Sequence, residues 1–176
     1  MAEPTLNLRT DPGSRHQQRQ ALLRSSSSTN GKGGNDPSWS FARDVARGLS
    51  SSPRALDCRY LYDRRGSELF EQICEQPEYY PTRTEEAILR EHAPRIAAFT
   101  GPVTLVELGA GTSLKTQHVL RAYCEVEDEP FYVAVDVSSS ALQKGRKAVE
   151  HELPAVQFHP FCATYDEGVR LLPHVS

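Results

Sequence analysis

Two short apolar runs, each closing with an acidic residue, constrain the fold of this chain more than any other feature. The first spans residues 103–108 and opens into the glycine turn Gly109-Ala110-Gly111. The second spans residues 131–135, is closed by Asp136 and is followed by a helical pattern. Short apolar runs that lead into helices are typical of buried strands in α/β proteins. The sequence therefore predicts an α/β sheet of the kind that binds nucleosides.

The composition favours a domain that acts on a small molecule. The chain has 176 residues and a net charge of -3, which provides no overall field for nucleic acid. No window is apolar for long enough to span a bilayer. The four cysteines stand far apart without a Cys-x-x-Cys pair, which fits reduced thiols. We therefore expect a cytoplasmic protein with no nucleic-acid or membrane partner.

The chain divides into three parts. Residues 1–37 are rich in small and polar side chains and should be disordered, because they cannot bury enough apolar surface to offset chain entropy. An organelle transit peptide is the alternative for this tail, but its acidic residues count against one. Residues 38–100 should form a helical segment. Residues 101–176 should form an α/β domain, with a third strand at Ala155 to Phe158 and a helix starting near Asp166.

Three helices are predicted in the segment that precedes the sheet. The apolar spacing of residues 39–49 indicates the first, and apolar residues within 69–73 mark the second. Thr82 and Glu85 have the spacing of a capping box, which should start the third helix. Pro94 should break or kink that helix.

The glycine turn indicates the class of ligand. Gly109 and Gly111 would let a ligand approach the backbone closely. The usual dinucleotide pattern has a glycine where this chain has Leu114, and Glu107 would repel phosphates. An acidic loop suits S-adenosylmethionine, which carries an ammonium and a sulfonium. Asp136 follows Gly111 by about 25 residues, close to the roughly 20 expected for the acid that holds ribose hydroxyls.

Other side chains near the turn have less specific roles. Lys115 begins the next helix, where it would meet either solvent or a ligand carboxylate. Thr112 and Ser113 are not surrounded by a Gly-x-Ser-x-Gly elbow and should cap that helix instead. The histidines lack metal-ligand spacing. We therefore predict no catalytic nucleophile and no metal site.

Three ordered motifs resemble one known family. They read Tyr-Asp-Arg-Arg-Gly-Ser-Glu-Leu-Phe at 62–70, Pro-Glu-Tyr-Tyr-Pro-Thr-Arg-Thr-Glu at 77–85, and Glu-Leu-Gly-Ala-Gly-Thr-Ser-Leu-Lys-Thr at 107–116. In order and spacing they resemble the histidine N-alpha-methyltransferase family of ergothioneine biosynthesis. The resemblance runs from about residue 61 to residue 172, and its Tyr-Tyr-Pro-Thr-Arg element is much more specific than the glycine turn.

The resemblance implies a class I, Rossmann-like methyltransferase sheet that binds S-adenosylmethionine. It also implies trimethylation of the α-amino group of L-histidine to histidine betaine, or hercynine. Lys115 would reach the methionine carboxylate, and residues 38–100 would contribute to the substrate site, where either Tyr79 or Tyr80 faces the amino acid. The cofactor-binding residues implied are Gly109, Gly111, Lys115, Asp136, Thr164 and Tyr165.

Two of those residues depart from the pattern of many bacterial members of the family. Those members have an acid where this chain has Thr164, so the resemblance does not imply a carboxylate contact to adenine at this position. Tyr165 would either stack on the adenine or be an ordinary aromatic residue at a strand end.

The chain supplies only three strands, so we expect the first half of the sheet, inactive alone and with its opening strand exposed at an edge. Two alternatives to histidine methylation stay open. One is the same fold acting on another amine, such as a prenylated tryptophan. The other is a truncated, non-catalytic module that pairs with another chain through the exposed sheet edge.

Overall fold

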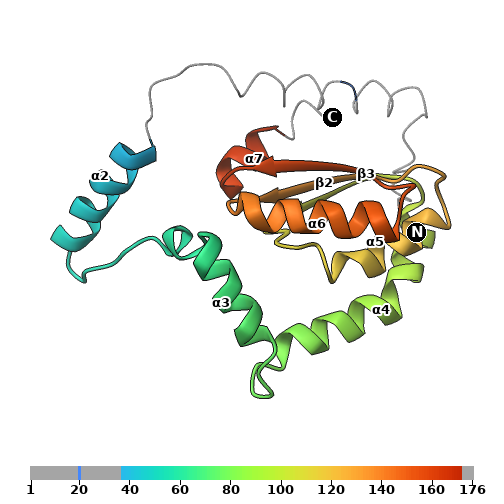
Figure 1. Ribbon diagram of the computed structural model, residues 1–176. Helices are drawn as coiled ribbons and strands as arrows, with labels where there is room; N and C mark the ends of the chain where they lie inside the picture. The colour runs from blue at the N-terminus through green and yellow to red at the C-terminus, as the bar shows by residue number, and fades with distance from the viewer. Residues whose placement is uncertain (1–19, 21–36, 172–176) are drawn as a thin grey trace, which may run out of the picture.

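The computed structural model describes residue 20 and residues 37–171 (Figure 1). The disorder expected for residues 1–37 thus falls outside the described residues, apart from Gln20 and Pro37. In chain order the elements are α2 (Pro37–Ser50), the 3-10 helix η1 (Cys58–Leu61), α3 (Arg64–Cys74), α4 (Pro81–Thr100), β1 (Thr104–Leu108), α5 (Thr116–Cys124), β2 (Phe131–Asp136), α6 (Ser139–Glu152), β3 (Gln157–Cys162) and α7 (Tyr165–Leu171).

The three strands form one parallel sheet in the order β1-β2-β3, which confirms the predicted α/β class. Phe131 of the central strand pairs with Thr104 on one side and with Gln157 on the other. β3 begins at Gln157 rather than Ala155 and runs on to Cys162. Within the described part of the chain β1 pairs on one side only, so it lies at an edge of the sheet, as expected.

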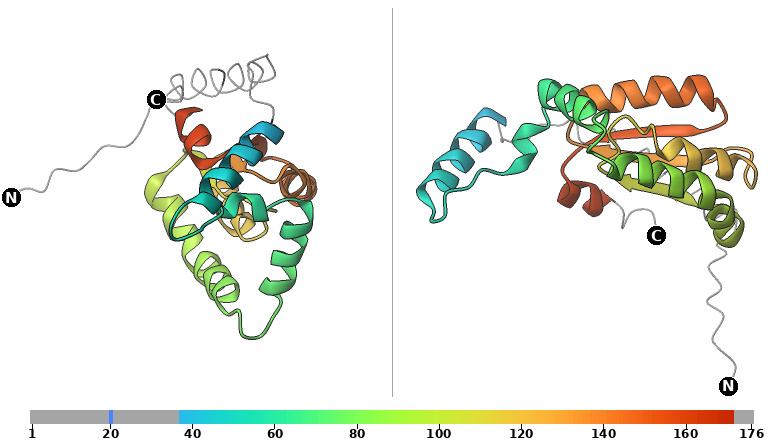
Figure 2. Two further views of the ribbon diagram at one scale, coloured as in Figure 1. Left: turned by 90° about the vertical axis from the view of Figure 1, so that its left-hand side faces the viewer. Right: turned by 90° about the horizontal axis from the view of Figure 1, so that it is seen from below.

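Both faces of β2 are buried, which explains why its sequence is a continuous apolar run. Tyr132 and Ala134 join a core with residues of α5 and α6. Phe131, Val133 and Val135 pack on the opposite face, where α7 also contacts β2. Figure 1 shows α6 in front of the sheet, and Figure 2 shows the remaining helices from two further sides. β2 thus lies between α5 and α6 on one face and α7 on the other.

The helical segment before the sheet follows the prediction in number but not in detail. α2 and α3 form where apolar spacing indicated them. The capping box predicted from Thr82 and Glu85 is wrong, because the cap of α4 is Tyr80 and no side chain caps it. Pro81 occupies the first helical turn, where a missing N–H costs nothing, and this shifts the start of the helix ahead of Thr82.

Pro94 does not break α4, which continues from Pro81 to Thr100. The buried side chains of Ala93 and Ala97 pack against Ala122 and Tyr123 of α5. A proline inside a helix costs about 3 kcal/mol or more, and the burial of this helix face compensates for that cost. Packing against α5 therefore helps α4 to continue as one helix past Pro94.

Candidate functional site

The glycine turn after β1 and the acid at the end of β2 meet at the carboxyl end of the sheet. The backbone amides of Gly109 and Ala110 both donate to the carbonyl of Val135, at 2.8 and 3.1 Å. These bonds fasten the turn to the end of the neighbouring strand. The two sequence motifs that predicted a nucleoside site are therefore brought together.

Asp136 closes this arrangement with its carboxylate. Oδ2 accepts a hydrogen bond from the amide of Gly111 at 2.8 Å, and Oδ1 accepts one from the amide of Ser138 at 2.8 Å. Ser138 in turn caps α6, with its hydroxyl accepting from the amide of Ala141. A carboxylate has about four lone-pair sites, so each oxygen of Asp136 retains capacity for a hydroxyl donor. Vicinal ribose hydroxyls fit that capacity.

The two glycines differ in what lies above them. Gly111 has a φ of 53°, and a Cβ built there would meet no heavy atom within 4 Å. Gly109 has a φ of 80°, and its Cβ would lie 2.5 Å from the hydroxyl oxygen of Tyr165. Both conformations favour glycine. The turn thus has open space over Gly111, while the Tyr165 ring lies against Gly109.

A buried hydroxyl network supports the turn, and sequence reasoning missed it. Ser113 has a φ of 54° and is buried, with its hydroxyl 2.9 Å from that of Tyr132. The carboxylate of Glu107 accepts from Tyr132 at 2.5 Å and from Thr116 at 2.7 Å. The only sequence signal was a tyrosine in an apolar strand. Ser113 therefore packs in the core, and the prediction that it caps the next helix is wrong.

The same network sets the electrostatics beneath the turn. Burial raises the pKa of Glu107, and the hydrogen bonds from Tyr132 and Thr116 lower it only in part. Burial, together with the Glu107 charge, also raises the pKa of Tyr132. Glu107 thus binds two groups of its own protein through one carboxylate oxygen, Oε2.

Lys115 lies directly before α5 rather than inside it, and neither Thr112 nor Ser113 caps that helix. The ammonium of Lys115 pairs with the carboxylate of Glu85 in α4. One turn further on, the ring of His118 lies 3.3 Å from the carboxylate of Glu86. Two pairs thus join α4 to the region that follows the glycine turn.

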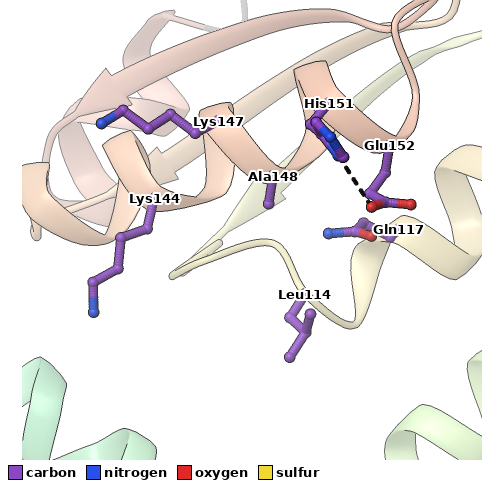
Figure 3. A pocket seen from close by; sticks show the side chains of 7 residues that line it. All are labelled: Leu114, Gln117, Lys144, Lys147, Ala148, His151 and Glu152. Carbon is purple, nitrogen blue, oxygen red and sulfur yellow. Dashed lines mark hydrogen bonds and ion pairs between the residues drawn. The ribbon is translucent and has the colours of Figure 1, made fainter.

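An open groove of about 650 Å³ lies beside α6, and Asp136 is not among the residues that line it (Figure 3). Only Leu114 connects this groove to the loop after β1. Its lining residues are Leu114, Gln117, Lys144, Lys147, Ala148, His151 and Glu152. None of the residues predicted to bind the cofactor lines this groove.

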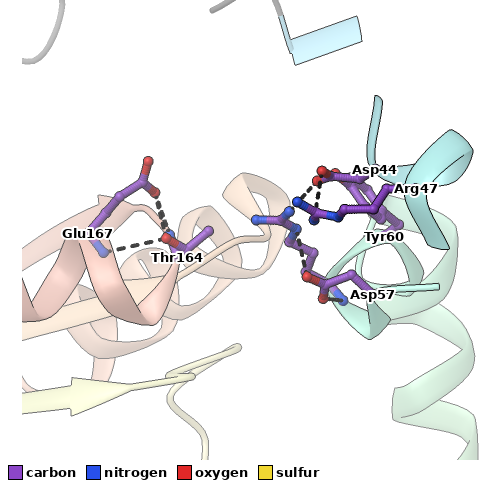
Figure 4. Close-up of polar contacts among 7 residues, drawn as sticks. Asp44, Arg47, Asp57, Tyr60, Thr164 and Glu167 are labelled. Atoms are coloured by element: carbon purple, nitrogen blue, oxygen red, sulfur yellow. Dashed lines mark hydrogen bonds and ion pairs between the residues drawn. The ribbon is translucent and has the colours of Figure 1, made fainter. Parts of the chain in front are cut away.

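Thr164 is held by the next turn of its own chain. Its amide and its hydroxyl both donate to the carboxylate of Glu167, at 2.9 and 2.8 Å (Figure 4). The amide of Glu167 lies 3.4 Å from the Thr164 hydroxyl, so the pair is a reciprocal capping box at the start of α7. The hydrogen bonds from the Thr164 amide and hydroxyl lower the pKa of Glu167.

Figure 4 also shows a polar cluster that fixes α2 to η1. The buried carboxylate of Asp44 accepts hydrogen bonds from Tyr60 at 2.7 Å, from Arg59 at 2.5 Å and from Arg47 at 3.0 Å. The hydrogen bond from Tyr60 and the two arginines lower the pKa of Asp44 against the opposing effect of burial. This cluster stabilises the helical segment rather than the glycine turn.

Tyr79 and Tyr80 precede α4, in the helical segment. The ring of Tyr79 packs edge-on against Phe70, with centroids 6.1 Å apart, and Tyr80 is 67% exposed. The helical segment also reaches the nucleoside site, because the hydroxyl of Ser67 in α3 donates to that of Ser138 at 3.0 Å. Ser138 therefore contacts both Asp136 and the segment that carries the tyrosines.

Among the described residues no group of three or more His, Cys, Asp or Glu side chains could hold a metal ion. No helix in the described part of the chain is long and apolar enough to cross a membrane.

Comparison with known proteins gives a consistent result. Residues 41–176 match the family model described as histidine-specific methyltransferase, SAM-dependent, where SAM is S-adenosylmethionine. A histidine N-alpha-methyltransferase of Mycolicibacterium smegmatis is 41% identical over 134 residues, which are 76% of this chain and 42% of the relative. A 4-dimethylallyltryptophan N-methyltransferase of Claviceps fusiformis is 27% identical over 141 residues, covering 77% of this chain and 40% of the relative.

A third relative is named ergothioneine biosynthesis protein 1, from Neurospora crassa, and is 35% identical over 117 residues, 66% of this chain and 13% of the relative. The chain thus spans less than half the length of these curated relatives. The family match covers most of the chain, including all three strands and the helical segment from Phe41. The chain belongs to the S-adenosylmethionine-dependent, histidine-specific methyltransferase family.

Proposed function

We propose that this chain is the cofactor-binding part of an N-methyltransferase that trimethylates the α-amino group of L-histidine to histidine betaine. The observation that carries the proposal is the Asp136 carboxylate, which is bonded to the Gly111 amide and retains acceptor capacity beside open space. Its setting at the carboxyl ends of two parallel strands is the usual place for a nucleoside in an α/β sheet. The family match supports both the cofactor and the amino-acid substrate.

The residues at this end of the sheet fit S-adenosylmethionine, which supplies a methyl group on a sulfonium. Asp136 would accept hydrogen bonds from the ribose hydroxyls, and the backbone at Gly109 and Gly111 would lie against the ligand. Lys115 would bind the methionine carboxylate. Tyr165 would stack on the adenine from the start of α7, with Thr164 beside it.

The substrate end of the site is proposed from the family motif around Tyr79 and Tyr80. Either ring would lie against histidine, and the Ser67 to Ser138 hydrogen bond would hold their segment against the cofactor end. Methyl transfer needs a deprotonated amine aligned with the methyl group, so positioning would supply most of the rate gain. Histidine is preferred over a prenylated tryptophan because the histidine enzyme is 41% identical and the tryptophan enzyme 27%.

For the fold we propose that residues 101–176 are the first half of a class I, Rossmann-like sheet and that residues 38–100 serve the substrate site. The exposed edge of β1 is the surface on which further strands, or another chain, would pair. We also propose a reducing, cytoplasmic location, which is supported by four free cysteines.

A chimera tests the substrate. Residues 41–171 replace the matching region of the Mycolicibacterium relative, and mass spectrometry follows methylation of L-histidine and of 4-dimethylallyltryptophan. Trimethylated histidine that depends on Asp136 supports the proposal. Methylation of the tryptophan derivative alone would show that the substrate is the tryptophan derivative and not histidine. A folded chimera that methylates neither compound contradicts the proposed function.

A further inference from the structure

Glu85 lies near the start of α4, beside the Tyr-Tyr-Pro-Thr-Arg motif, and the function proposed above gives it no role. It does not cap the helix. Its carboxylate pairs with the ammonium of Lys115, 30 positions further along the chain. The contact joins the substrate segment to the loop that follows the glycine turn.

The Lys115 to Glu85 pair adds little to the stability of the fold. The side chain of Glu85 is 55% exposed and that of Lys115 is 35% exposed. Ion pairs this exposed contribute about 0–1 kcal/mol, because water screens them and two long side chains lose freedom. The pair can therefore open for a ligand at little cost.

Of the two acids near Lys115, Glu85 is the exposed one. Burial raises the pKa of Glu107. The nearby charge of Lys115 lowers that pKa, and the nearby charge of Glu85 raises it. Glu107 already accepts hydrogen bonds from Tyr132 and Thr116. Glu85 is exposed and bonded to Lys115, so its remaining lone pairs can accept from a ligand.

The amino-acid end of S-adenosylmethionine presents a carboxylate and an ammonium on the same carbon. Lysine has three donors and no acceptor, so Lys115 can bind the carboxylate but not the ammonium. We propose that Glu85 binds the ammonium while Lys115 binds the carboxylate, so that the ion pair is the receptor for the zwitterion. This inference rests on the proposed function and adds a binding residue from the helical segment.

Two adenosine ligands that differ in their amino-acid end test the inference. S-adenosylhomocysteine has that end, and 5′-methylthioadenosine lacks it. Calorimetry on the full chain compares the wild type with Glu85→Gln and with Glu86→Gln, the matched control whose partner is His118. Glu85→Gln should weaken binding of S-adenosylhomocysteine about tenfold and leave 5′-methylthioadenosine within about twofold. Glu86→Gln should change neither affinity.

Equal weakening of both ligands by Glu85→Gln would show a structural role and overturn the inference, as would unchanged affinity. Tighter binding of S-adenosylhomocysteine would also overturn it, because Glu85 would then only compete for Lys115. Glu85→Asp should recover part of the affinity, since it keeps the charge. A wild type that binds neither ligand overturns the proposed function and this inference together, whereas binding without any effect of Glu85→Gln overturns the inference alone.

Discussion

The carboxylate of Asp136 accepts a hydrogen bond of 2.8 Å from the backbone amide of Gly111, which lies in the turn after the neighbouring strand. A single side chain thereby fixes the spacing between the ends of β1 and β2. Its other oxygen holds the amide of Ser138. Asp136 is therefore important for the shape of the turn as well as for the proposed ligand.

Replacing Asp136 should destabilise the fold in proportion to the acceptors removed. Asp136→Ala leaves the amides of Gly111 and Ser138 without a partner and should lower the free energy of unfolding by about 1–3 kcal/mol. Asp136→Asn keeps one acceptor oxygen and should cost less. Urea unfolding of both variants measures this order, with Asp128→Ala as a control at an exposed acid. An Asn variant less stable than the Ala variant would contradict the hydrogen-bond explanation.

Alanine at the two glycines should separate backbone strain from contact with Tyr165. Both Gly109→Ala and Gly111→Ala force a side chain into a positive φ, which costs about 1–2 kcal/mol. Only Gly109→Ala also pushes against the Tyr165 hydroxyl. A double-mutant cycle with Tyr165→Ala should therefore show coupling for Gly109 and none for Gly111. Coupling at both glycines, measured by urea unfolding, would mean that Tyr165 acts on the whole turn.

Glu107→Gln should change the pH dependence of stability. Burial raises the pKa of Glu107 in the folded chain above its ordinary value of 4.5. The contribution of Glu107 to the free energy of unfolding is therefore fully present below the unfolded pKa and is lost as pH rises through the folded pKa. Glutamine keeps an acceptor for Tyr132 and Thr116 without a charge. The variant should match the wild type near pH 4 and be more stable at pH 7. Urea midpoints from pH 4 to 8 measure the difference in stability between the variant and the wild type. A variant that is less stable than the wild type at pH 7 would contradict a destabilising charge on Glu107.

Pro94→Ala should stabilise α4. Pro94 is exposed and lies inside a continuous helix, where it lacks an N–H to donate. Alanine restores the donor and removes the ring clash, for a gain of up to about 3 kcal/mol. Thermal unfolding reports the gain, and Arg90→Ala on the same helix should stay within about 0.5 kcal/mol of the wild type. No gain at Pro94 would show that the helix has adapted to the proline.

Local patterns in the sequence predict the parts of this structure that local chemistry determines. The apolar runs before Gly109 and Asp136 form β1 and β2. β2 is buried on both faces, and such a strand needs nearly uninterrupted apolar side chains. The same Thr-x-x-Glu spacing occurs at Thr82 and at Thr164, yet only the second forms a capping box. Pro81 explains the difference, since it sets the start of α4 before Thr82 is reached.

Contacts between distant segments could not be read from the sequence. The Tyr165 ring against Gly109, the Lys115 pair with Glu85, and the Ser67 hydroxyl on Ser138 all depend on how helices pack on the sheet. None of these contacts has a periodic or compositional signal. Gly111 and Asp136 are bonded to each other, and Tyr165 lies against Gly109. The roles of these residues toward a cofactor, and of Tyr79 and Tyr80 toward a substrate, stay predictions.

Within residues 37–171, each strand of the sheet pairs with its neighbour in the sequence, in the order β1-β2-β3. Pairing of segments that are near in the sequence costs less loop-closure entropy than pairing of remote segments. The first two strands and α5 can therefore come together before β3 joins the sheet. The glycine turn and Asp136 would then be in place when β3 docks.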